Sequence, residues 1–262
     1  MNRNRAPWDL PGTAVPAPPL NGEAMDIFVR KLACQSPLSD DDRRALRSLP
    51  HSLRRMEQND HILREGDRAE ICPILLSGFA YRHKLAADGG RQIVAIKIPG
   101  EPLDLQSLHL RVADHNLQAL TAATLAMVPL VELEALIALR PAIGRALTVD
   151  ILIEASIGRE WLLNIGRRNA LARLAHLLCE LVHRLQMTGE PSLDEIDMPF
   201  TQEQLADLLG LTAVHVNRTL KTLEDAGGVR RSGRRLTIGD VETLCRIADY
   251  SDIYLHRDNA TA

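Results

Sequence analysis

Residues 201–227, TQEQLADLLGLTAVHVNRTLKTLEDAG, predict two short helices joined by a tight turn. Thr201 can cap the first helix, and Gln204 three residues later completes a capping box. Gly210 ends that helix, because glycine takes the left-handed turn conformation without steric cost. Thr212 is then placed to cap the second helix.

The second of these helices has two unlike faces. Val216, Leu220 and Leu223 recur at helical spacing and are expected to point inward. The opposite face carries Val214, His215, Asn217, Arg218 and Lys221. A short helix, a glycine turn and an amphipathic helix with a basic outer face are typical of a DNA-reading helix-turn-helix. An ordinary helical hairpin is the alternative interpretation.

Residues 229–238, VRRSGRRLTI, predict a β-hairpin with Ser232-Gly233 at its turn. The hairpin gathers four arginines around one tip: Arg230, Arg231, Arg234 and Arg235. A helix-turn-helix followed by a basic hairpin is typical of a winged helix, whose wing can lie along a phosphate backbone. A merely solvated turn is the weaker explanation, because these arginines follow a recognition-type helix.

Length and charge favour a two-domain protein with one local basic site. The chain has 262 residues, of which 45% are hydrophobic, enough for a core in each of two domains. The net charge is only -3, so a general polyanion binder is not expected, and the basic charge is concentrated in residues 218–235. The sequence shows no Ser-His-Asp arrangement, P-loop or dinucleotide fingerprint, so no catalytic residues are expected.

The cysteines and the apolar runs bear on the compartment. Cys34, Cys72, Cys179 and Cys245 are far apart and form no CxxC or Cys/His pairing, so neither zinc nor a redox couple is indicated. Isolated cysteines fit reduced thiols in the cytoplasm. The sequence has no apolar run long enough for a bilayer and no apolar signal-peptide core at its start. We therefore expect a cytoplasmic protein without a membrane partner.

The rest of the chain divides into three segments. Residues 1–22 contain five prolines and predict a disordered tail. Residues 23–140 predict a sensor domain in which two short helices, the second capped by Ser39, precede an antiparallel jelly roll. Its strand candidates are ICPILLSG, FAYRHKL, RQIVAIKI and LQALTAATLAMVPL, and Asp88-Gly89-Gly90 joins the second to the third. A jelly roll can enclose a small-molecule-sized cavity.

Residues 141–168 predict a dimerisation helix and hinge, and residues 169–262 a DNA-binding domain. A seam with alternating spacings of four and three, interrupted by Glu154, consists of Leu147, Ile151, Gly158, Trp161 and Ile165. We expect a homodimer, because helix-turn-helix dimers and palindromic DNA sites share two-fold symmetry. Packing of this helix on its own sensor domain is the alternative. The GRRN sequence at 166–169 then breaks the helix.

A jelly roll, long helix, glycine-containing hinge and winged helix in this order resemble the Crp/Fnr family of bacterial transcription regulators. The resemblance covers residues 25–250, and its most specific parts are FTQEQLADLLGLTAVHVNRTLKTLEDAG and IPGEPLDLQSL. It implies an α+β fold with an N-terminal cyclic-nucleotide-binding-like jelly roll joined by a long dimerisation helix to a C-terminal winged helix-turn-helix. It also implies a homodimer that binds a palindromic site on double-stranded DNA and acts on RNA polymerase.

The resemblance also places the DNA contacts. Positions facing base edges match Ala213, Val214, Asn217 and Arg218. Positions near phosphates or in the wing match Gln202, Thr212, His215, Lys221, Arg231, Gly233 and Arg234. Many members carry glutamate where this chain has Val214, which can make only apolar contact, for example with a thymine methyl. Arg218 can grip guanine O6 and N7, so we expect a half-site that keeps a guanine but differs from the familiar family consensus.

The sensor segment departs further from the family. Cyclic-AMP-binding members have a Gly-Glu pair and an Arg-Ser pair that hold ribose and cyclic phosphate, where this chain has Asp104-Leu105 and Ala113-Asp114. An aspartate in a phosphate position repels the ligand, so we do not expect cyclic AMP to bind and the effector is unknown. A cyclic-nucleotide-dependent activator is the alternative. The hinge at 166–169 would transmit an effector's action by setting the recognition helices one DNA turn apart, about 34 Å.

Other cofactors have little support in the sequence. An iron–sulfur centre needs clustered N-terminal cysteines, and Cys34 stands alone in the first 70 residues. A metal-binding jelly-roll enzyme would use His83, His109 and His115, but no HxH pairing or carboxylate set completes the ligands. Haem bound by one of these histidines is left open.

Overall fold

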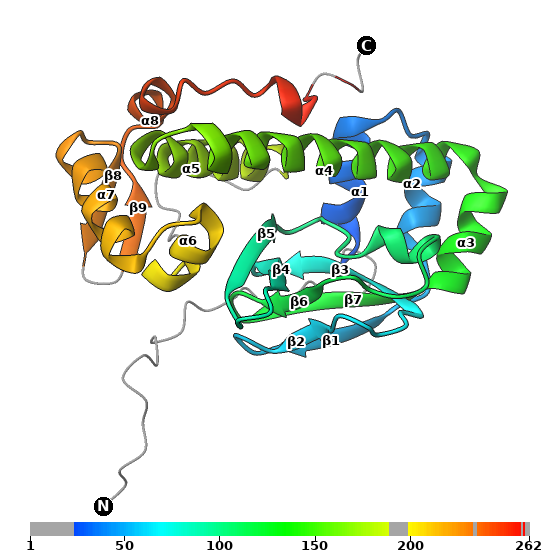
Figure 1. The fold of residues 1–262 in the computed structure, drawn as a ribbon. Coiled ribbons are helices and arrows are strands. Elements are labelled where there is room, and N and C mark those ends of the chain that lie inside the picture. The colour runs from blue at the N-terminus through cyan, green and yellow to red at the C-terminus, as the bar shows by residue number, and fades with distance from the viewer. Residues whose placement is uncertain (1–23, 189–198, 233–234, 258, 260–262) are drawn as a thin grey trace, which may run out of the picture.

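The computed structural model describes residues 24–188, 199–232, 235–257 and 259. An N-terminal sheet domain is followed by the long helix α4 (Pro141–Arg167) and then by a helical domain with a two-stranded hairpin (Figure 1). This mixed arrangement of helix and sheet is the α+β fold that the sequence predicts. The predicted tail at 1–22 lies outside the described residues.

Two short helices precede the sheets, α1 (Asp26–Gln35) and α2 (Asp40–Arg47). The hydroxyl of Ser39 accepts a hydrogen bond from the backbone N–H of Asp42 at 3.2 Å, and the Asp42 carboxylate accepts one from the Ser39 N–H. This capping box confirms Ser39 as the cap of α2.

The sensor domain contains two antiparallel sheets. The strand order of the first is β1 (Ser52–Met56), β7 (Ala123–Pro129) and β3 (Ile71–Ser77). The order of the second is β2 (His61–Leu63), β6 (Asn116–Ala119), β4 (Ala80–Leu85) and β5 (Arg91–Lys97). Leu75, Leu117 and Leu125 belong to one buried cluster contributed by strands of both sheets. This packing of two sheets through their apolar faces forms the core of the jelly roll.

Turns divide the strands much as predicted, with one difference. The β4–β5 hairpin closes at Gly89, whose φ of +85° only glycine adopts easily, and the Ala86 N–H donates to the Gly90 carbonyl at 2.8 Å. The segment LQALTAATLAMVPL, predicted as one strand, is the end of β6 and all of β7. The turn lies at residues 120–122, where Gly78 approaches the backbone too closely for a side chain.

The 3-10 helix η1 (Leu105–Leu108) follows β5, and helix α3 (Leu130–Leu139) contacts both β7 and η1. Pro141 then occupies the first turn of α4, where its missing N–H costs nothing. Helix α4 ends at Arg167 and α5 (Ala170–Met187) begins three residues later. The Asn169 side chain accepts from the Ala172 N–H at 3.0 Å, which confirms the predicted break between the two helices.

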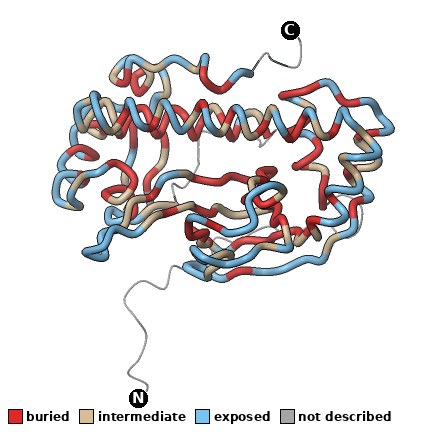
Figure 2. The backbone as a smooth tube through the Cα atoms, turned by 45° about the vertical axis from the view of Figure 1, so that its right-hand side comes forward, coloured by how far each residue is buried: buried red, intermediate tan, exposed pale blue. Residues whose placement is uncertain are grey.

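The C-terminal domain is built on α5, α6 (Gln202–Leu209) and α7 (Ala213–Asp225). Strands β8 (Val229–Ser232) and β9 (Arg235–Ile238) form the hairpin, and α8 (Val241–Ala248) packs on α5. Buried and exposed stretches alternate along the helices, as expected for elements with one inward face (Figure 2). Ile93 and Ile96 of the sensor share one core cluster with Leu205 of α6, so the two domains are packed together.

A C-terminal segment beyond α8 returns along α4 toward α1 (Figure 1). It includes the 3-10 helix η3 (Ile253–Leu255). The Tyr254 hydroxyl donates to the Glu180 carboxylate at 2.9 Å, and the Asn259 amide donates to the Gln35 carbonyl at 2.9 Å. The segment therefore contacts both the DNA-binding domain and the sensor domain. No helix within the described residues is long and apolar enough to cross a membrane.

Candidate DNA interface and sensor cavity

Local backbone chemistry builds the helix-turn-helix. The Thr201 hydroxyl accepts from the Gln204 N–H at 3.1 Å, while the Gln204 side chain accepts from the Thr201 N–H at 2.9 Å. Gly210 has φ 62° and ψ 42°, the left-handed conformation that ends α6. The Thr212 hydroxyl accepts from the His215 N–H at 3.2 Å and begins α7. All of these local features confirm the prediction from sequence.

The two faces of α7 are also as predicted. Val216, Leu220 and Leu223 are at most 4% exposed and pack into the domain core. Val214 is 71% exposed, so its methyl groups are open to contact from outside the domain. The polar side chains beside it are also exposed: His215, Asn217, Arg218 and Lys221. Ala213, at the start of the helix, is half-buried.

The hairpin after α7 is a wing of four paired positions, from Val229 opposite Ile238 to Ser232 opposite Arg235. Arg231 does not extend freely from it. Its guanidinium contacts the Glu224 carboxylate at 2.9 Å and donates to the Asn217 side-chain oxygen at 3.0 Å. The Gln202 amide donates to the same oxygen at 3.4 Å. Three predicted DNA contacts are thus joined in one polar chain. Gly233 and Arg234 lie outside the described residues.

Helix α6 is attached to the sensor hairpin. The Arg91 Nε donates to the Asp207 carboxylate at 2.7 Å. The Gln92 side chain donates to the backbone carbonyls of Asp207 at 2.6 Å and Leu208 at 3.2 Å. The position of the helix-turn-helix relative to the sensor is therefore set by β5. Sequence reasoning missed this contact, because no local pattern links residues more than a hundred positions apart.

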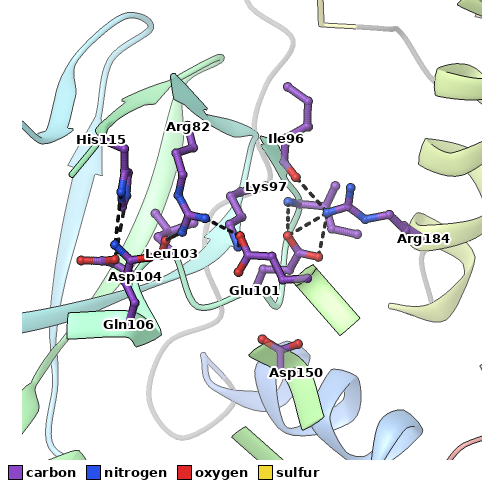
Figure 3. A network of polar contacts seen from close by, with 12 residues as sticks. Arg82, Ile96, Lys97, Glu101, Leu103, Asp104, Gln106, His115, Asp150 and Arg184 are labelled. Atoms are coloured by element: carbon purple, nitrogen blue, oxygen red, sulfur yellow. Dashed lines mark hydrogen bonds and ion pairs between the residues drawn. The ribbon is translucent and has the colours of Figure 1, made fainter. Parts of the chain in front are cut away.

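A cavity of about 300 Å³ lies between strand β5, helix α4 and the ends of α1 and α5. Charged side chains from both domains converge on it (Figure 3). Arg82 contacts the Glu154 carboxylate at 2.6 Å, and Lys97 contacts it at 2.9 Å. Burial alone would raise the pKa of Glu154, but the charges of Lys97 and Arg82 hold it at about 2. Glu154, which interrupts the predicted seam, thus binds α4 to the sensor strands.

A second ion cluster connects the sensor to the DNA-binding domain. The Arg184 guanidinium on α5 donates to both Glu101 carboxylate oxygens, at 2.9 and 3.0 Å, and to the Ile96 carbonyl at 2.8 Å. Lys31 lies 3.7 Å from Glu101 and pairs with Asp150 of α4. Burial opposes ionisation of Glu101, but Arg184 and Lys31 outweigh it and place its pKa at about 2.

The positions compared with cyclic-AMP-binding members carry carboxylates. Asp104 is fully buried, accepts a hydrogen bond from the Ser107 hydroxyl, and has one oxygen 3.8 Å from His115. Ala113 is buried, whereas the Asp114 side chain is 78% exposed and bonds the His115 ring at 2.8 Å. Hydrogen bonds from His115 and Gln106 lower the pKa of Asp114 to about 2, so it is negatively charged at neutral pH.

The three histidines considered as metal ligands differ in burial. His83 and His115 are buried inside the sensor domain, while His109 is exposed. Within the described residues, no group of three or more His, Cys, Asp and Glu side chains is arranged to hold a metal ion. The structure therefore offers no support for a metal centre built from these histidines.

The predicted seam on α4 is divided between two environments. Leu147 and Trp161 are only 2% and 7% exposed, because they pack within their own chain, and the Trp161 indole donates to Glu180 at 2.9 Å. Ile151 and Ile165 are half-buried, and Gly158 is exposed. Packing of α4 on its own sensor domain, the alternative interpretation, accounts for Leu147, whereas Trp161 packs with α5 of the DNA-binding domain. The heptad pattern alone could not separate this face from the exposed one beside it.

An exposed recognition helix with a wing, attached to a jelly roll through a long helix, defines a DNA-binding transcription regulator. Residues 172–247 match the family model for a Crp-like helix-turn-helix domain, and residues 53–140 match that for a cyclic nucleotide-binding domain.

Curated relatives agree with this class. The chain is 30% identical over 208 residues to the nitrogen fixation regulation protein FixK of Bradyrhizobium diazoefficiens, covering 78% of this chain and 84% of the relative. It is 26% identical over 180 residues to the transcriptional activator protein FnrL of Cereibacter sphaeroides, covering 68% and 72%. The fold is similar to the solved structure of FixK2 from Bradyrhizobium japonicum, with a TM-score of 0.70, 24% identity, and coverage of 78% and 100%.

The chain belongs to the Crp/Fnr family of transcription regulators. Its fold and its relatives are those of DNA-binding regulators and not of enzymes.

Proposed function

We propose that this regulator acts in the cytoplasm as a homodimer that binds palindromic promoter sites and activates transcription through RNA polymerase, independently of cyclic AMP. The observation that carries the proposal is the exposed outer face of α7, which presents His215, Asn217, Arg218 and Lys221 beside a basic wing. Activation is favoured by the similarity to FnrL, a transcriptional activator.

Base reading is assigned to the outer face of α7. Arg218 is exposed and can donate two hydrogen bonds to guanine O6 and N7. Val214 stands one turn earlier on the same helix and offers a methyl surface for a thymine. The further base-facing positions are Ala213 and Asn217. The Asn217 oxygen is already hydrogen-bonded to Gln202 and Arg231, so its amide N–H groups are the donors left for an acceptor on the DNA.

Phosphate contacts are assigned to the remaining matched positions of the helix-turn-helix and the wing sequence. They are Gln202, Thr212, His215, Lys221, Arg231, Gly233 and Arg234. Such contacts fix register and affinity but carry no sequence information directly. Their loss should therefore weaken binding to all sequences alike, whereas loss of Arg218 should change the preferred base.

The homodimer is assigned to the outer face of α4, with a second copy of this chain as its occupant. Leu152 is 61% exposed and Leu162 is 74% exposed, at positions that share one helix face with Ala155 and Gly158. A Cβ built at Gly158 would meet nothing within 4 Å, so a second backbone can approach closely there. Of the predicted seam, Gly158 belongs to this face, Ile151 and Ile165 border it, and Leu147 and Trp161 support it from inside.

Independence from cyclic AMP is supported by the charges in the cavity. Each of its four cationic side chains, Lys31, Arg82, Lys97 and Arg184, contacts a carboxylate of this chain. A cyclic phosphate would have to displace Glu154 or Glu101 from these partners and would leave a buried carboxylate uncompensated. A cyclic-nucleotide-dependent activator is the second candidate, favoured by the match of residues 53–140 to the cyclic nucleotide-binding domain.

The central experiment compares bound DNA sites for wild type and Arg218→Ala, with Arg44→Ala as control because Arg44 is an exposed arginine on α2. Binding-site selection with the wild type should recover a palindrome with a guanine in each half-site. Arg218→Ala should lose about 1–3 kcal/mol of discrimination at that guanine. Arg44→Ala should behave as wild type. An unchanged motif and affinity for Arg218→Ala would refute the assignment.

Two further measurements test the proposed homodimer and the proposed independence from cyclic AMP. Light scattering should report a dimer for the wild type and a smaller mass for Leu152→Glu, because one charge per chain would then lie in the proposed interface on the outer face of α4. An unchanged mass would place the dimer interface elsewhere. Calorimetry with cyclic AMP and cyclic GMP should show no binding, and stoichiometric binding of either would favour the second candidate.

A further inference from the structure

The DNA-binding domain brings two thiols into contact that are 66 positions apart in the sequence. Cys179 lies on α5 and Cys245 on α8, and their sulfur atoms are 3.2 Å apart. Helix α8 lies directly on α5 (Figure 1). No redox couple is indicated by the sequence, because it has no CxxC spacing, whereas tertiary packing brings these two thiols together without one.

The pair is both close enough and accessible enough to react. A disulfide has an S–S length of about 2.05 Å, so the two sulfur atoms need to approach by about 1.1 Å. Cys179 is buried, whereas Cys245 is half-buried at the edge of the same core. A small oxidant can therefore reach Cys245, with Cys179 held directly behind it.

The other two cysteines serve as internal comparisons. Cys34 is exposed, and its sulfur lies 3.7 Å from a backbone carbonyl, that of Met187. Cys72 is buried in the sensor domain, where burial raises the pKa of its thiol to about 12. Neither Cys34 nor Cys72 lies at the α5–α8 contact, so neither can replace Cys179 or Cys245 in a disulfide between these helices.

We propose that Cys179 and Cys245 are a redox-active thiol pair, which a hydroperoxide oxidises to an intramolecular disulfide between α5 and α8. The Cys245 sulfur attacks the outer oxygen of the hydroperoxide, the O–O bond breaks, and an alcohol or water leaves with Cys245 as the sulfenic acid. The Cys179 sulfur then attacks the Cys245 sulfur, the S–O bond breaks, and water leaves with the Cys179 proton. Two thiols are oxidised and one peroxide is reduced.

The order of these steps follows from burial. Burial and the neighbouring Cys245 thiol raise the pKa of Cys179, so Cys179 holds its proton and reacts slowly with oxidants in solution. The half-buried Cys245 reacts first, and Cys179 resolves the sulfenic acid before a second peroxide arrives because it is already in contact.

The bond would join two helices of the core on which the recognition helix rests. Val216 and Leu220 of α7 belong to the same buried cluster as Cys179. A disulfide across 66 positions restricts the unfolded chain and should stabilise the domain. The oxidised protein should therefore melt on the order of 5 °C higher than the reduced one.

The test is peptide mapping of the full-length Cys34→Ser protein, which removes the exposed thiol. The protein is treated with hydrogen peroxide, unfolded, alkylated and digested. The expected result is one linked α5–α8 peptide pair, lighter than its two reduced parts by two hydrogen atoms and released by dithiothreitol. Two of the three remaining thiols are lost while the mass of the assembly is unchanged, and the melting temperature rises until reductant is added.

A variant series separates the pair from general thiol oxidation. In Cys245→Ser, Cys179 should remain alkylatable after peroxide treatment that fully oxidises the exposed Cys34 of the wild type. Alkylation of both Cys179 and Cys245 in peroxide-treated Cys34→Ser protein would overturn the proposal. A sulfinic acid at Cys245 beside a free Cys179 thiol would overturn it equally. Because the mapping uses the intact pair, it does not depend on whether Cys245→Ser folds.

Discussion

Replacing Arg184 by methionine removes the cation that joins the sensor domain to the DNA-binding domain. Its guanidinium contacts Glu101 at 2.9 Å, Glu180 at 3.0 Å and the Ile96 carbonyl at 2.8 Å. Methionine fills similar volume but leaves the buried carboxyl groups of Glu101 and Glu180 without this cation. Removal of one partner from a buried ion pair costs about 3–5 kcal/mol.

The pKa of Glu101 gives a second measure of the same interaction. Its pKa falls from the ordinary 4.5 to about 2 despite burial, which corresponds to about 3 kcal/mol of preference for the charged form. The Arg184 and Glu101 side chains are only 6% and 7% exposed, so solvent screens this interaction little. Because Lys31 and Lys97 share in this shift and remain in the variant, we expect Arg184→Met to lower the free energy of unfolding by about 3 kcal/mol, the lower end of the range for a broken buried ion pair.

The pH dependence identifies the cause of the loss. A carboxyl whose pKa is lower in the folded than in the unfolded state adds stability above its unfolded pKa, and this stability is lost as the pH falls toward the folded value. For Glu101 the loss runs from about pH 5 down to about pH 2. The difference between wild type and Arg184→Met should therefore be full at pH 7 and should narrow as the pH falls through this range.

Urea unfolding at a series of pH values measures this difference. Arg257→Met is the control, because Arg257 pairs with Asp252 at side-chain exposures of 39% and 47% and should contribute less than about 1 kcal/mol. A loss below about 1 kcal/mol for Arg184→Met at pH 7, or a difference that stays constant down to pH 3, would refute the interpretation of this cluster.

Two further substitutions test the sensor turn and the C-terminal segment by urea unfolding. Gly78→Ala and Gly89→Ala both place a side chain at positive φ, but only at Gly78 would the Cβ lie 2.3 Å from a backbone carbonyl oxygen. Gly89→Ala should cost about 1–2 kcal/mol and Gly78→Ala clearly more, and equal losses would contradict the close approach. Tyr254→Phe removes a buried hydroxyl that donates to Glu180, with an expected loss of about 1–3 kcal/mol. Ile253→Ala is the control, because the Ile253 side chain is 80% exposed and its loss should cost less than about 0.5 kcal/mol. An equally small loss for Tyr254→Phe would show that the Tyr254–Glu180 hydrogen bond contributes little to stability.

Features that depend on a few neighbouring residues were predictable from the sequence. The capping box of Thr201 and Gln204 and the left-handed Gly210 follow from hydrogen bonds within one helical turn. The inward and outward faces of α7 follow from the 3.6-residue period. The turn at Gly89 was predictable for the same reason, because the residues of the turn themselves set its backbone conformation.

Periodicity was a weaker guide where an element has two apolar faces. On α4 the spacing that selected Leu147 and Trp161 describes a face that packs within the chain, while Leu152 and Leu162 stand exposed on another. Glu154 interrupts the apolar spacing of α4 because it pairs with Arg82 of the sensor sheet. An apolar pattern shows that a face is covered, but it does not show by which chain.

The helix-turn-helix, the wing and the β4–β5 turn follow from the local sequence, because each is formed by contacts between residues close in the chain. Only the tertiary structure brought Arg184 to Glu101, Arg91 to Asp207 and Cys179 to Cys245. A buried charge or thiol requires a suitable environment, but its own sequence neighbourhood does not say which distant residue provides it. Which distant residue becomes the partner depends on how the helices and sheets pack against one another. In this protein, that packing creates both the ion cluster and the thiol pair.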